Sequence, residues 1–325
     1  MPIQSLVGLR HFATKMTSVT RWCVLGVSGT DNKSDFGIDK TNKQMGATMR
    51  HLSAVLTLVL MAASVTAAER ENCYGICPSG SPAKNKMVTR NHYTLSNNPE
   101  TKFADWVAYK ITRSSLGGED ERGWAKDPEL DAGDTLAKSD YDGAYVALKV
   151  DRGHQAPLAS MSGLKNWEVL NYLSNITPQS SALNRGAWKA LEMAEREFAR
   201  SLSNPTVYVI TGTLYERDMK RMPQAKRPHV VPSGYWKVIA IEDGDTFKTA
   251  TFVMHQDVKS GSDYCNYVVT LGDVEERTNL KLFPSLSAAQ RKALAEQPGQ
   301  LVERVGCEFI TETASVKKIK KKTKS

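Results

Sequence analysis

The sequence predicts one mixed α+β domain in which mostly antiparallel strands form a sheet core and helices flank it. Its 325 residues are 41% hydrophobic and 24% charged, as in ordinary globular proteins. Short alternating apolar and polar runs predict strands, and a few segments have the period of a helix. Residues 69–310 contain no internal repeat or low-complexity linker, so we expect a single domain there.

The pattern places the elements as follows. Strands are expected at residues 86–93, 106–112, 144–150, 207–211, 235–241, 249–255 and 264–270. The clearest helix is expected at 181–201, and weaker ones at 271–278 and 287–296.

Residues 49–68 have the layout of a secretory signal peptide: a basic start, an apolar run over 52–65 and small residues at the cleavage point. The run is shorter than the ~20 residues that a membrane-spanning helix needs, which disfavours a membrane anchor. We therefore expect cleavage near Ala67 or Ala68. The mature protein is then periplasmic or extracellular and has no membrane association.

Residues 1–48 precede that signal and show no clear helical or strand period. One interpretation is an upstream leader from a mis-assigned start, with translation beginning at Met49 or Met45. The alternative is a mitochondrial presequence, because three basic residues precede the first acid at Asp31.

The formal net charge of +8 is concentrated at the two ends of the chain. Between residues 69 and 315 there are 30 basic and 32 acidic residues, so bulk charge does not indicate a basic nucleic-acid-binding domain. Residues 311–325 form a Lys-rich tail with no apolar period, which we expect to be disordered. The tail is either a solvated charge run or a handle for nucleic acid or an anionic surface.

Four of the five cysteines lie after residue 68: Cys73, Cys77, Cys265 and Cys307. An oxidising compartment would allow two disulfides, and nearest spacing favours Cys73–Cys77 and Cys265–Cys307 among the three pairings. Zinc binding is the competing use. It is disfavoured because no second cysteine pair or histidine pair at ligand spacing accompanies Cys73 and Cys77.

Two segments carry residues suited to catalysis. The expected strand at 144–150 runs into DRGHQAP at 151–157, which delivers Arg152 and His154 together from a strand end. Histidine can deprotonate water near neutral pH, and arginine suits phosphate by charge and shape. Residues 171–179 add several amide oxygens.

On the expected helix 181–201, Asn184, Trp188, Glu192 and Arg196 recur every four residues and share one stripe beside the apolar face. This stripe could line a partly enclosed site. The alternative is an ordinary Glu192–Arg196 pair on a solvated face, with Asn184 near the helix start as a capping residue.

The sequences DRGHQAPLAS at 151–160, NYLSNITPQ at 171–179 and LNRGAWKALE at 183–192 resemble the Serratia-type DNA/RNA non-specific endonucleases. These belong to a wider group of nucleases with a ββα metal site. The likeness extends from about Cys73 to Cys307. It implies hydrolysis of both DNA and RNA, an α+β fold with the ββα motif, and a homodimer.

The resemblance also implies roles for individual residues. His154 would be the general base that activates water. Asn184 would be the sole direct protein ligand of a Mg²⁺ ion, with Mn²⁺ as a substitute, and Glu192 would hold the water shell of the metal. Asn175 and Arg152 would support the site.

Two further arginines follow from the resemblance. Arg196 would steady Glu192 or contact phosphate. Arg122 would neutralise charge in the transition state, although the acids at 119–121 depart from the family pattern and leave an ordinary loop arginine as the alternative.

The implied mechanism is attack of water on phosphorus, with 5′-phosphate and 3′-hydroxyl products and little dependence on sequence or sugar. Two other functions use the same fold: a non-catalytic nucleic-acid-binding protein and a mitochondrial endonuclease G-like nuclease. A serine hydrolase using Ser160 or Ser174 with His154 is disfavoured because no G-x-S-x-G turn is present.

Overall fold

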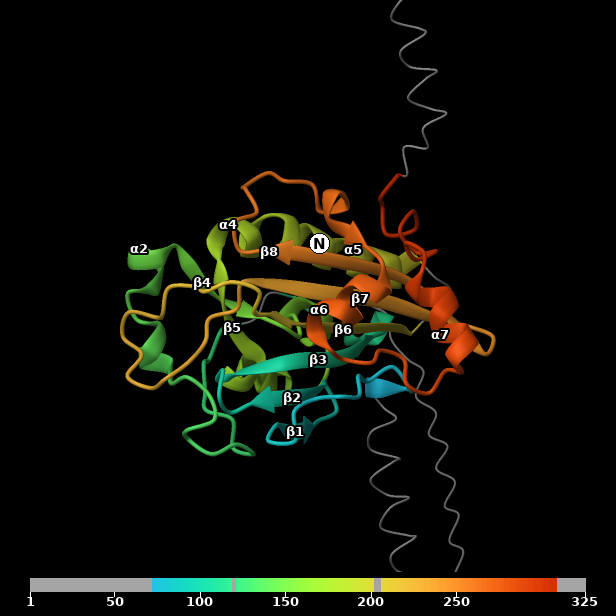
Figure 1. Ribbon diagram of the computed structural model, residues 1–325. Helices are drawn as coiled ribbons and strands as arrows, with labels where there is room; N and C mark the ends of the chain where they lie inside the picture. The colour runs from blue at the N-terminus through green and yellow to red at the C-terminus, as the bar shows by residue number, and fades with distance from the viewer. Residues whose placement is uncertain (1–71, 119–120, 202–205, 309–325) are drawn as a thin grey trace, which may run out of the picture. The chain divides into compact units, whose positions relative to one another are not determined.

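The computed structural model describes residues 72–118, 121–201 and 206–308 (Figure 1). They contain a seven-stranded sheet with the order β1-β2-β3-β6-β7-β8-β9, in which every neighbouring pair is antiparallel. A second, two-stranded antiparallel sheet joins β4 and β5. The predicted α+β class with a mostly antiparallel sheet is confirmed.

The strands are β1 Lys86–Thr89, β2 Thr94–Asn98, β3 Phe103–Ile111, β4 Val150–His154, β5 Ile176–Ser180, β6 Val207–Leu214, β7 Gly234–Asp243, β8 Thr246–His255 and β9 Val268–Val269. The helices are α2 Ala144–Leu148, α3 Leu158–Met161, α4 Ser181–Arg185, α5 Ala187–Ser201, α6 Leu271–Thr278 and α7 Ala288–Ala295. Short 3-10 turns lie at Arg113–Ser115, Lys138–Tyr141, Trp167–Asn171, Leu173–Asn175 and Tyr264–Tyr267.

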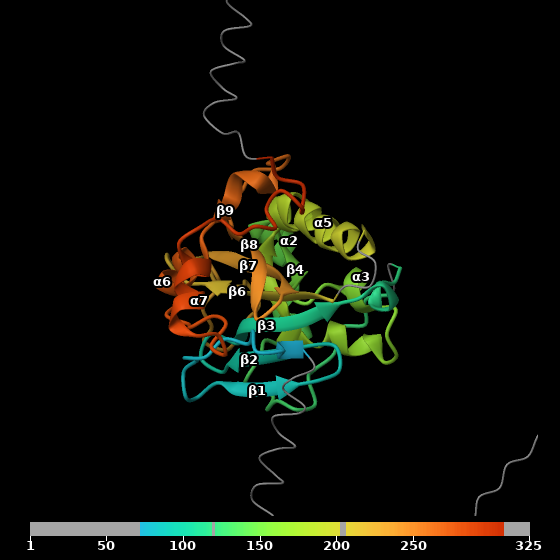
Figure 2. The ribbon, with the colours of Figure 1, turned by 90° about the vertical axis from the view of Figure 1, so that its right-hand side faces the viewer.

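The large sheet is buried on both faces. Alternate residues of a strand point to opposite faces, so Tyr109 and Trp106 of β3 enter different cores. Tyr109 shares one core with Leu191 of α5, and Trp106 shares the other with Val274 of α6. In Figure 2, α6 and α7 lie to the left of the strands and α5 lies to the right. Helix α5, which carries part of the predicted stripe, is thus fixed on one face of the sheet.

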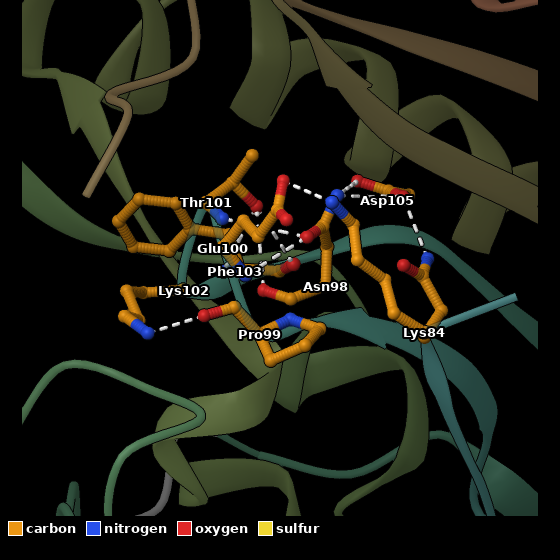
Figure 3. Close-up of polar contacts among 9 residues, drawn as sticks. Lys84, Asn98, Pro99, Glu100, Thr101, Lys102, Phe103 and Asp105 are labelled. Carbon is orange, nitrogen blue, oxygen red and sulfur yellow. Dashed lines mark hydrogen bonds and ion pairs between the residues drawn. The ribbon is translucent and has the colours of Figure 1, made fainter. Parts of the chain in front are cut away.

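A polar turn connects β2 to β3 (Figure 3). The Asn98 Oδ1 atom accepts hydrogen bonds from the backbone N–H groups of Glu100 at 3.0 Å and Thr101 at 3.4 Å. The Asn98 Nδ2 atom donates to Asp105 at 3.2 Å. Lys102 has a φ of 75°, a left-handed conformation, and its backbone N–H donates to the Asn98 carbonyl oxygen at 2.9 Å.

The predicted strand at 144–150 is wrong. Ala144–Leu148 is helix α2, and only Val150 belongs to β4. Gly143 before the helix and Lys149 after it both have left-handed φ values, 71° and 55°. These two left-handed residues limit the helix to about one turn. An alternating pattern over so few residues fits a turn of helix as well as a strand.

Two other predictions need correction. Residues 264–270 form a 3-10 turn over Tyr264–Tyr267 and only the two-residue strand β9. The predicted helix 181–201 is interrupted at Gly186, where ψ is −117°, and becomes α4 and α5. A Cβ atom at Gly186 would lie 2.4 Å from the carbonyl oxygen of Ala182, so a larger residue does not fit this break.

Strands β2 and β5 were not predicted. β5 contains Pro178, which usually argues against a strand, but the two-stranded sheet leaves one edge free of ladder hydrogen bonds.

Both predicted disulfides are present. Cys73 pairs with Cys77 at a Cα–Cα distance of 4.7 Å, and Cys265 pairs with Cys307 at 5.3 Å. The second bond ties the end of the described chain to the segment before β9.

Several domain predictions fall beyond what the structure describes. The leader at 1–48, the signal at 49–68 and the tail at 311–325 lie outside the described residues. The domain limits of 69–310 stay a prediction. None of the helices in the described ranges is long and apolar enough to cross a membrane.

Candidate active site

A cavity of about 760 Å³ lies beside α2, β4, α4 and the first turns of α5. Six of the seven predicted site residues line it: Arg122, Arg152, His154, Asn184, Glu192 and Arg196. The seventh, Asn175, is fully buried and does not line the cavity. The structure therefore brings together side chains from positions 122 to 196.

The strand pair β4–β5 positions the histidine. His154 is the last residue of β4 and lies opposite Ile176 in the ladder. Gly153 lies opposite Thr177, and a Cβ atom at Gly153 would come within 2.8 Å of the Gln179 Cβ atom. Glycine therefore allows β5 to approach closely. Because α4 follows β5 directly, the two strands and the helix form a ββα unit.

The His154 imidazole is held by Asn171 and packs near Trp124. Its Nε2 atom lies 3.1 Å from the Asn171 Oδ1 atom, and the Trp124 ring centroid lies 5.3 Å from that of the imidazole. Burial lowers the pKa of His154 to about 4, although the hydrogen bond to Asn171 opposes this effect. His154 is therefore neutral at pH 7. Because Oδ1 only accepts, Nε2 carries the proton and Nδ1 keeps the lone pair.

Asp151 orients Asn184. The Asn184 Nδ2 atom donates to the Asp151 Oδ2 atom at 3.1 Å, and Arg185 binds both oxygens of the same carboxylate at 2.8 and 2.6 Å. Burial raises the pKa of Asp151, but the hydrogen bonds from Arg185 and Asn184 outweigh it and the net pKa is lowered. Among the described residues, none donates a hydrogen bond to the Asn184 Oδ1 atom. This amide oxygen is thus available in the cavity.

The donor set suits a hard cation that keeps most of its waters. An amide oxygen at Asn184 near the carboxylate of Glu192 matches the oxygen ligands that Mg²⁺ prefers. The described ranges contain no group of three or more His, Cys, Asp or Glu side chains that could enclose a metal ion.

Glu192 lies next to a buried ion cluster formed by Lys237 and Glu195. The fully buried Lys237 Nζ atom lies 3.9 Å from the Glu192 Oε1 atom and 2.7 Å from the Glu195 Oε1 atom. The Tyr109 hydroxyl donates to the Glu195 Oε2 atom at 3.1 Å. Burial raises the pKa of Glu192 to about 7, an effect that the charge of Lys237 opposes.

Arg152 of β4 and Arg196 of α5 both line the cavity. Arg152 donates to the backbone oxygen of Lys138 at 3.0 Å, and its guanidinium carbon lies 5.2 Å from the Tyr141 ring centroid. Arg196 donates to the Ser160 Oγ atom at 3.5 Å.

Asn175 and Arg122 have different relations to His154. Asn175 makes three hydrogen bonds, two to Ala156 and one to the Leu170 carbonyl, so it holds the backbone that follows the histidine. Arg122 lines the cavity, and its positive charge contributes to the lowered pKa of His154.

The lining of the cavity is positively charged, although the central part of the chain is not. Five cationic side chains and three carboxylates line the cavity. A net positive lining suits a polyanionic substrate even though the central body of the chain is not basic.

Sequence analysis assigned no role to Asp151 or Lys237, and it treated Asn171 only as one of several amide oxygens. Asp151 lies inside the DRGHQAP motif, next to Arg152. Lys237 alternates along the strand with the buried residues Tyr235 and Ile239. A lysine at a position expected to be buried could have indicated a buried ionic partner.

Comparisons with known proteins show the family to which this chain belongs. A family model described as DNA/RNA non-specific endonuclease matches residues 76–289. A nuclease from Serratia marcescens is 46% identical over 255 residues, which cover 78% of this chain and 96% of the relative. Human mitochondrial endonuclease G is 30% identical over 223 residues, covering 64% of this chain and 73% of that protein.

A solved structure agrees as well. The crystal structure of the EndoG/EndoGI complex aligns with a TM-score of 0.56 at 25% identity, covering 68% of this chain and 93% of that one. The family match spans well over half of the sequence and includes every residue of the cavity. The chain belongs to the DNA/RNA non-specific endonuclease family, whose members hydrolyse phosphodiester bonds.

Proposed function

We propose that this endonuclease cleaves DNA and RNA with His154 as general base and Mg²⁺ on Asn184, leaving 5′-phosphate and 3′-hydroxyl ends. One observation carries the proposal. A neutral, half-buried imidazole and an amide oxygen that accepts no hydrogen bond from a described residue line the same cavity.

His154 takes the proton of the attacking water on its Nδ1 atom. The Asn171 Oδ1 atom, 3.1 Å from Nε2, fixes the ring and stabilises the imidazolium that forms. Burial keeps the ring unprotonated before the step, so at neutral pH the base is in its active form.

Asn184 would bind the metal directly and Glu192 through water, while Asp151 turns the Asn184 amide oxygen into the cavity. When bound, Mg²⁺ supplies charge that polarises a non-bridging phosphate oxygen and stabilises the departing 3′-oxygen. We expect Mn²⁺ to substitute for Mg²⁺, because both accept oxygen ligands.

The arginines act on the phosphate. Arg122 would balance the charge that grows on the transition state, and Arg152 and Arg196 would hold the phosphate near His154. Cations that address phosphate carry no sequence information, which supports cleavage of both nucleic acids.

We also propose that residues 49–68 direct export and that the mature enzyme is a homodimer in an oxidising compartment. The two disulfides support this location over a mitochondrial one. N-terminal sequencing of the exported protein and its mass in solution test the two points.

The main experiment compares purified residues 69–325 with His154→Ala on supercoiled plasmid and on RNA, with Mg²⁺ or with EDTA. We expect degradation of both substrates only by the wild type with metal, and end-group analysis should find 5′-phosphates. Equal degradation by His154→Ala at matched folding would refute the assignment of the base.

A further inference from the structure

One wall of the cavity has features that the proposed reaction does not use. Tyr145 and Val146 of α2 line the cavity and are 47% and 80% exposed. In the described ranges, they are the only two neighbours in sequence among the exposed large apolar side chains. Adjacent exposed apolar residues at the edge of a site indicate a binding surface.

Two cations lie over the Tyr145 ring. The Lys149 Nζ atom and the Arg185 guanidinium carbon each lie 5.0 Å from the ring centroid, and Lys189 lines the same cavity. Arg185 is held by its two hydrogen bonds to Asp151, so it braces the ring. Lys149 and Lys189 are exposed at the surface. An exposed aromatic ring with cationic side chains beside it is an arrangement that binds single-stranded nucleic acid, with stacking for bases and charge for phosphates.

The position of this ring is fixed relative to Asn184. The carbonyl oxygen of Lys149, the left-handed residue that ends α2, accepts hydrogen bonds from the backbone N–H and the hydroxyl of Ser181 at 2.8 and 2.9 Å. Ser181 is the first residue of α4, which carries Asn184. A surface held in place before binding loses little entropy when a ligand docks.

We propose that Tyr145 and Val146 form a subsite for an unpaired nucleobase next to the scissile phosphate, with Lys149 and Lys189 on the adjoining phosphates. The inference rests on the proposed function, because His154 and Asn184 define where the scissile phosphate lies. Every base has a π face, so stacking here is compatible with cleavage at any sequence. Bases inside a duplex are covered by their neighbours, and the subsite therefore favours single-stranded DNA, RNA and open ends.

The test compares three labelled substrates: a single-stranded oligonucleotide with one cleavable phosphodiester, the same strand with abasic residues beside that bond, and its duplex. The variants are Tyr145→Ala, Tyr145→Trp and the matched control Tyr74→Ala, since Tyr74 is 48% exposed and lies outside the cavity.

For the single strand, we expect Tyr145→Ala to raise KM about tenfold with little change in kcat. Tyr145→Trp should restore a low KM, and Tyr74→Ala should leave KM unchanged. On the abasic and duplex substrates, Tyr145→Ala and the wild type should behave alike. An equal loss on all three substrates, or no loss on any, would overturn the subsite.

A second measurement separates this inference from the proposed reaction. Binding of the single strand is followed by fluorescence anisotropy in EDTA, with His154→Ala compared with the same protein carrying Tyr145→Ala. A weaker complex for the double variant supports the subsite even if cleavage does not depend on His154. Equal affinity of the two proteins overturns the subsite even if cleavage does require His154.

Discussion

Glu192 and Glu195 lie one turn apart on α5 and share the buried lysine Lys237, yet they belong to two regions with opposite surroundings. Glu192 lines the cavity with the proposed catalytic groups. Glu195 is fully buried and bonded to Lys237 and Tyr109 within the core. The comparison shows that the cavity lies next to a buried ion cluster whose role is to stabilise the fold. Changes in the cavity should cost activity, and changes below it should cost stability.

The largest expected effect lies in the cavity. His154→Ala and Asn184→Ala should each lower kcat by about 10³-fold or more, because the proton acceptor or the metal ligand is lost. Their Tm should stay within about 2 °C of wild type, since neither removes core packing. Kinetics and calorimetry on the same samples check this. A fall in Tm as large as that of a core variant would show that these cavity residues also stabilise the fold, which would contradict the distinction between the two regions.

The buried region should show the reverse. Lys237→Met leaves Glu195 without its cation in the core and should destabilise the protein by about 3–5 kcal/mol. Activity measured where the variant is still folded should fall far less than for His154→Ala. Chemical denaturation gives the free energy of unfolding. Adding Glu195→Gln should recover part of the loss, and its failure to do so would show that packing of the lysine stem dominates.

The third prediction concerns Asp151, a cavity residue that orients the proposed metal ligand Asn184. Asp151→Ala removes the acceptor that orients the Asn184 amide, so the apparent affinity for Mg²⁺ should fall about 10–100-fold. A titration of activity with Mg²⁺ measures the change. Asp142→Ala is the matched control, because that aspartate lines the cavity and contacts Arg152 rather than Asn184. Equal Mg²⁺ dependence of Asp151→Ala and wild type would contradict the orienting role.

The smallest effect concerns pH. Burial raises the pKa of Glu192 to about 7, so its neutral form is favoured in the folded protein. Its contribution to stability is complete below the unfolded pKa of about 4.3 and is lost as pH rises through about 7. Glu192→Gln should therefore gain stability relative to wild type between pH 4 and pH 8, measured in EDTA. A constant difference across this range would show that the pKa is not raised.

Sequence could predict much of this site because its residues cluster in three local motifs. His154 and Arg152 lie in β4, and Asn184 and Glu192 line the same cavity even though Gly186 divides the predicted helix. What sequence missed are partners far along the chain. Asp151 meets Asn184 across 33 positions, and Lys237 meets Glu195 from another element. Such pairings depend on sheet register and packing, which local periodicity does not encode.

The misread segment 144–150 has a similar cause. Alternation over seven residues fits a strand, but the left-handed residues Gly143 and Lys149 confine it to one helical turn. Lysine rarely adopts this conformation, and here it is held by the hydrogen bond from its own N–H to the Tyr145 carbonyl and by the hydrogen bonds from Ser181 to its carbonyl oxygen.

The two margins of the large sheet have a consequence for assembly. Its outermost strands are β1 with four residues and β9 with two, and β9 pairs with only Thr251 and Phe252 of β8. Each outermost strand therefore presents only a short row of unpaired backbone N–H and C=O groups. Short edges offer little template for a foreign strand, which protects the protein against fibrillar aggregation at high concentration. In the proposed homodimer, a second copy would then associate through side-chain surfaces rather than by extending the sheet.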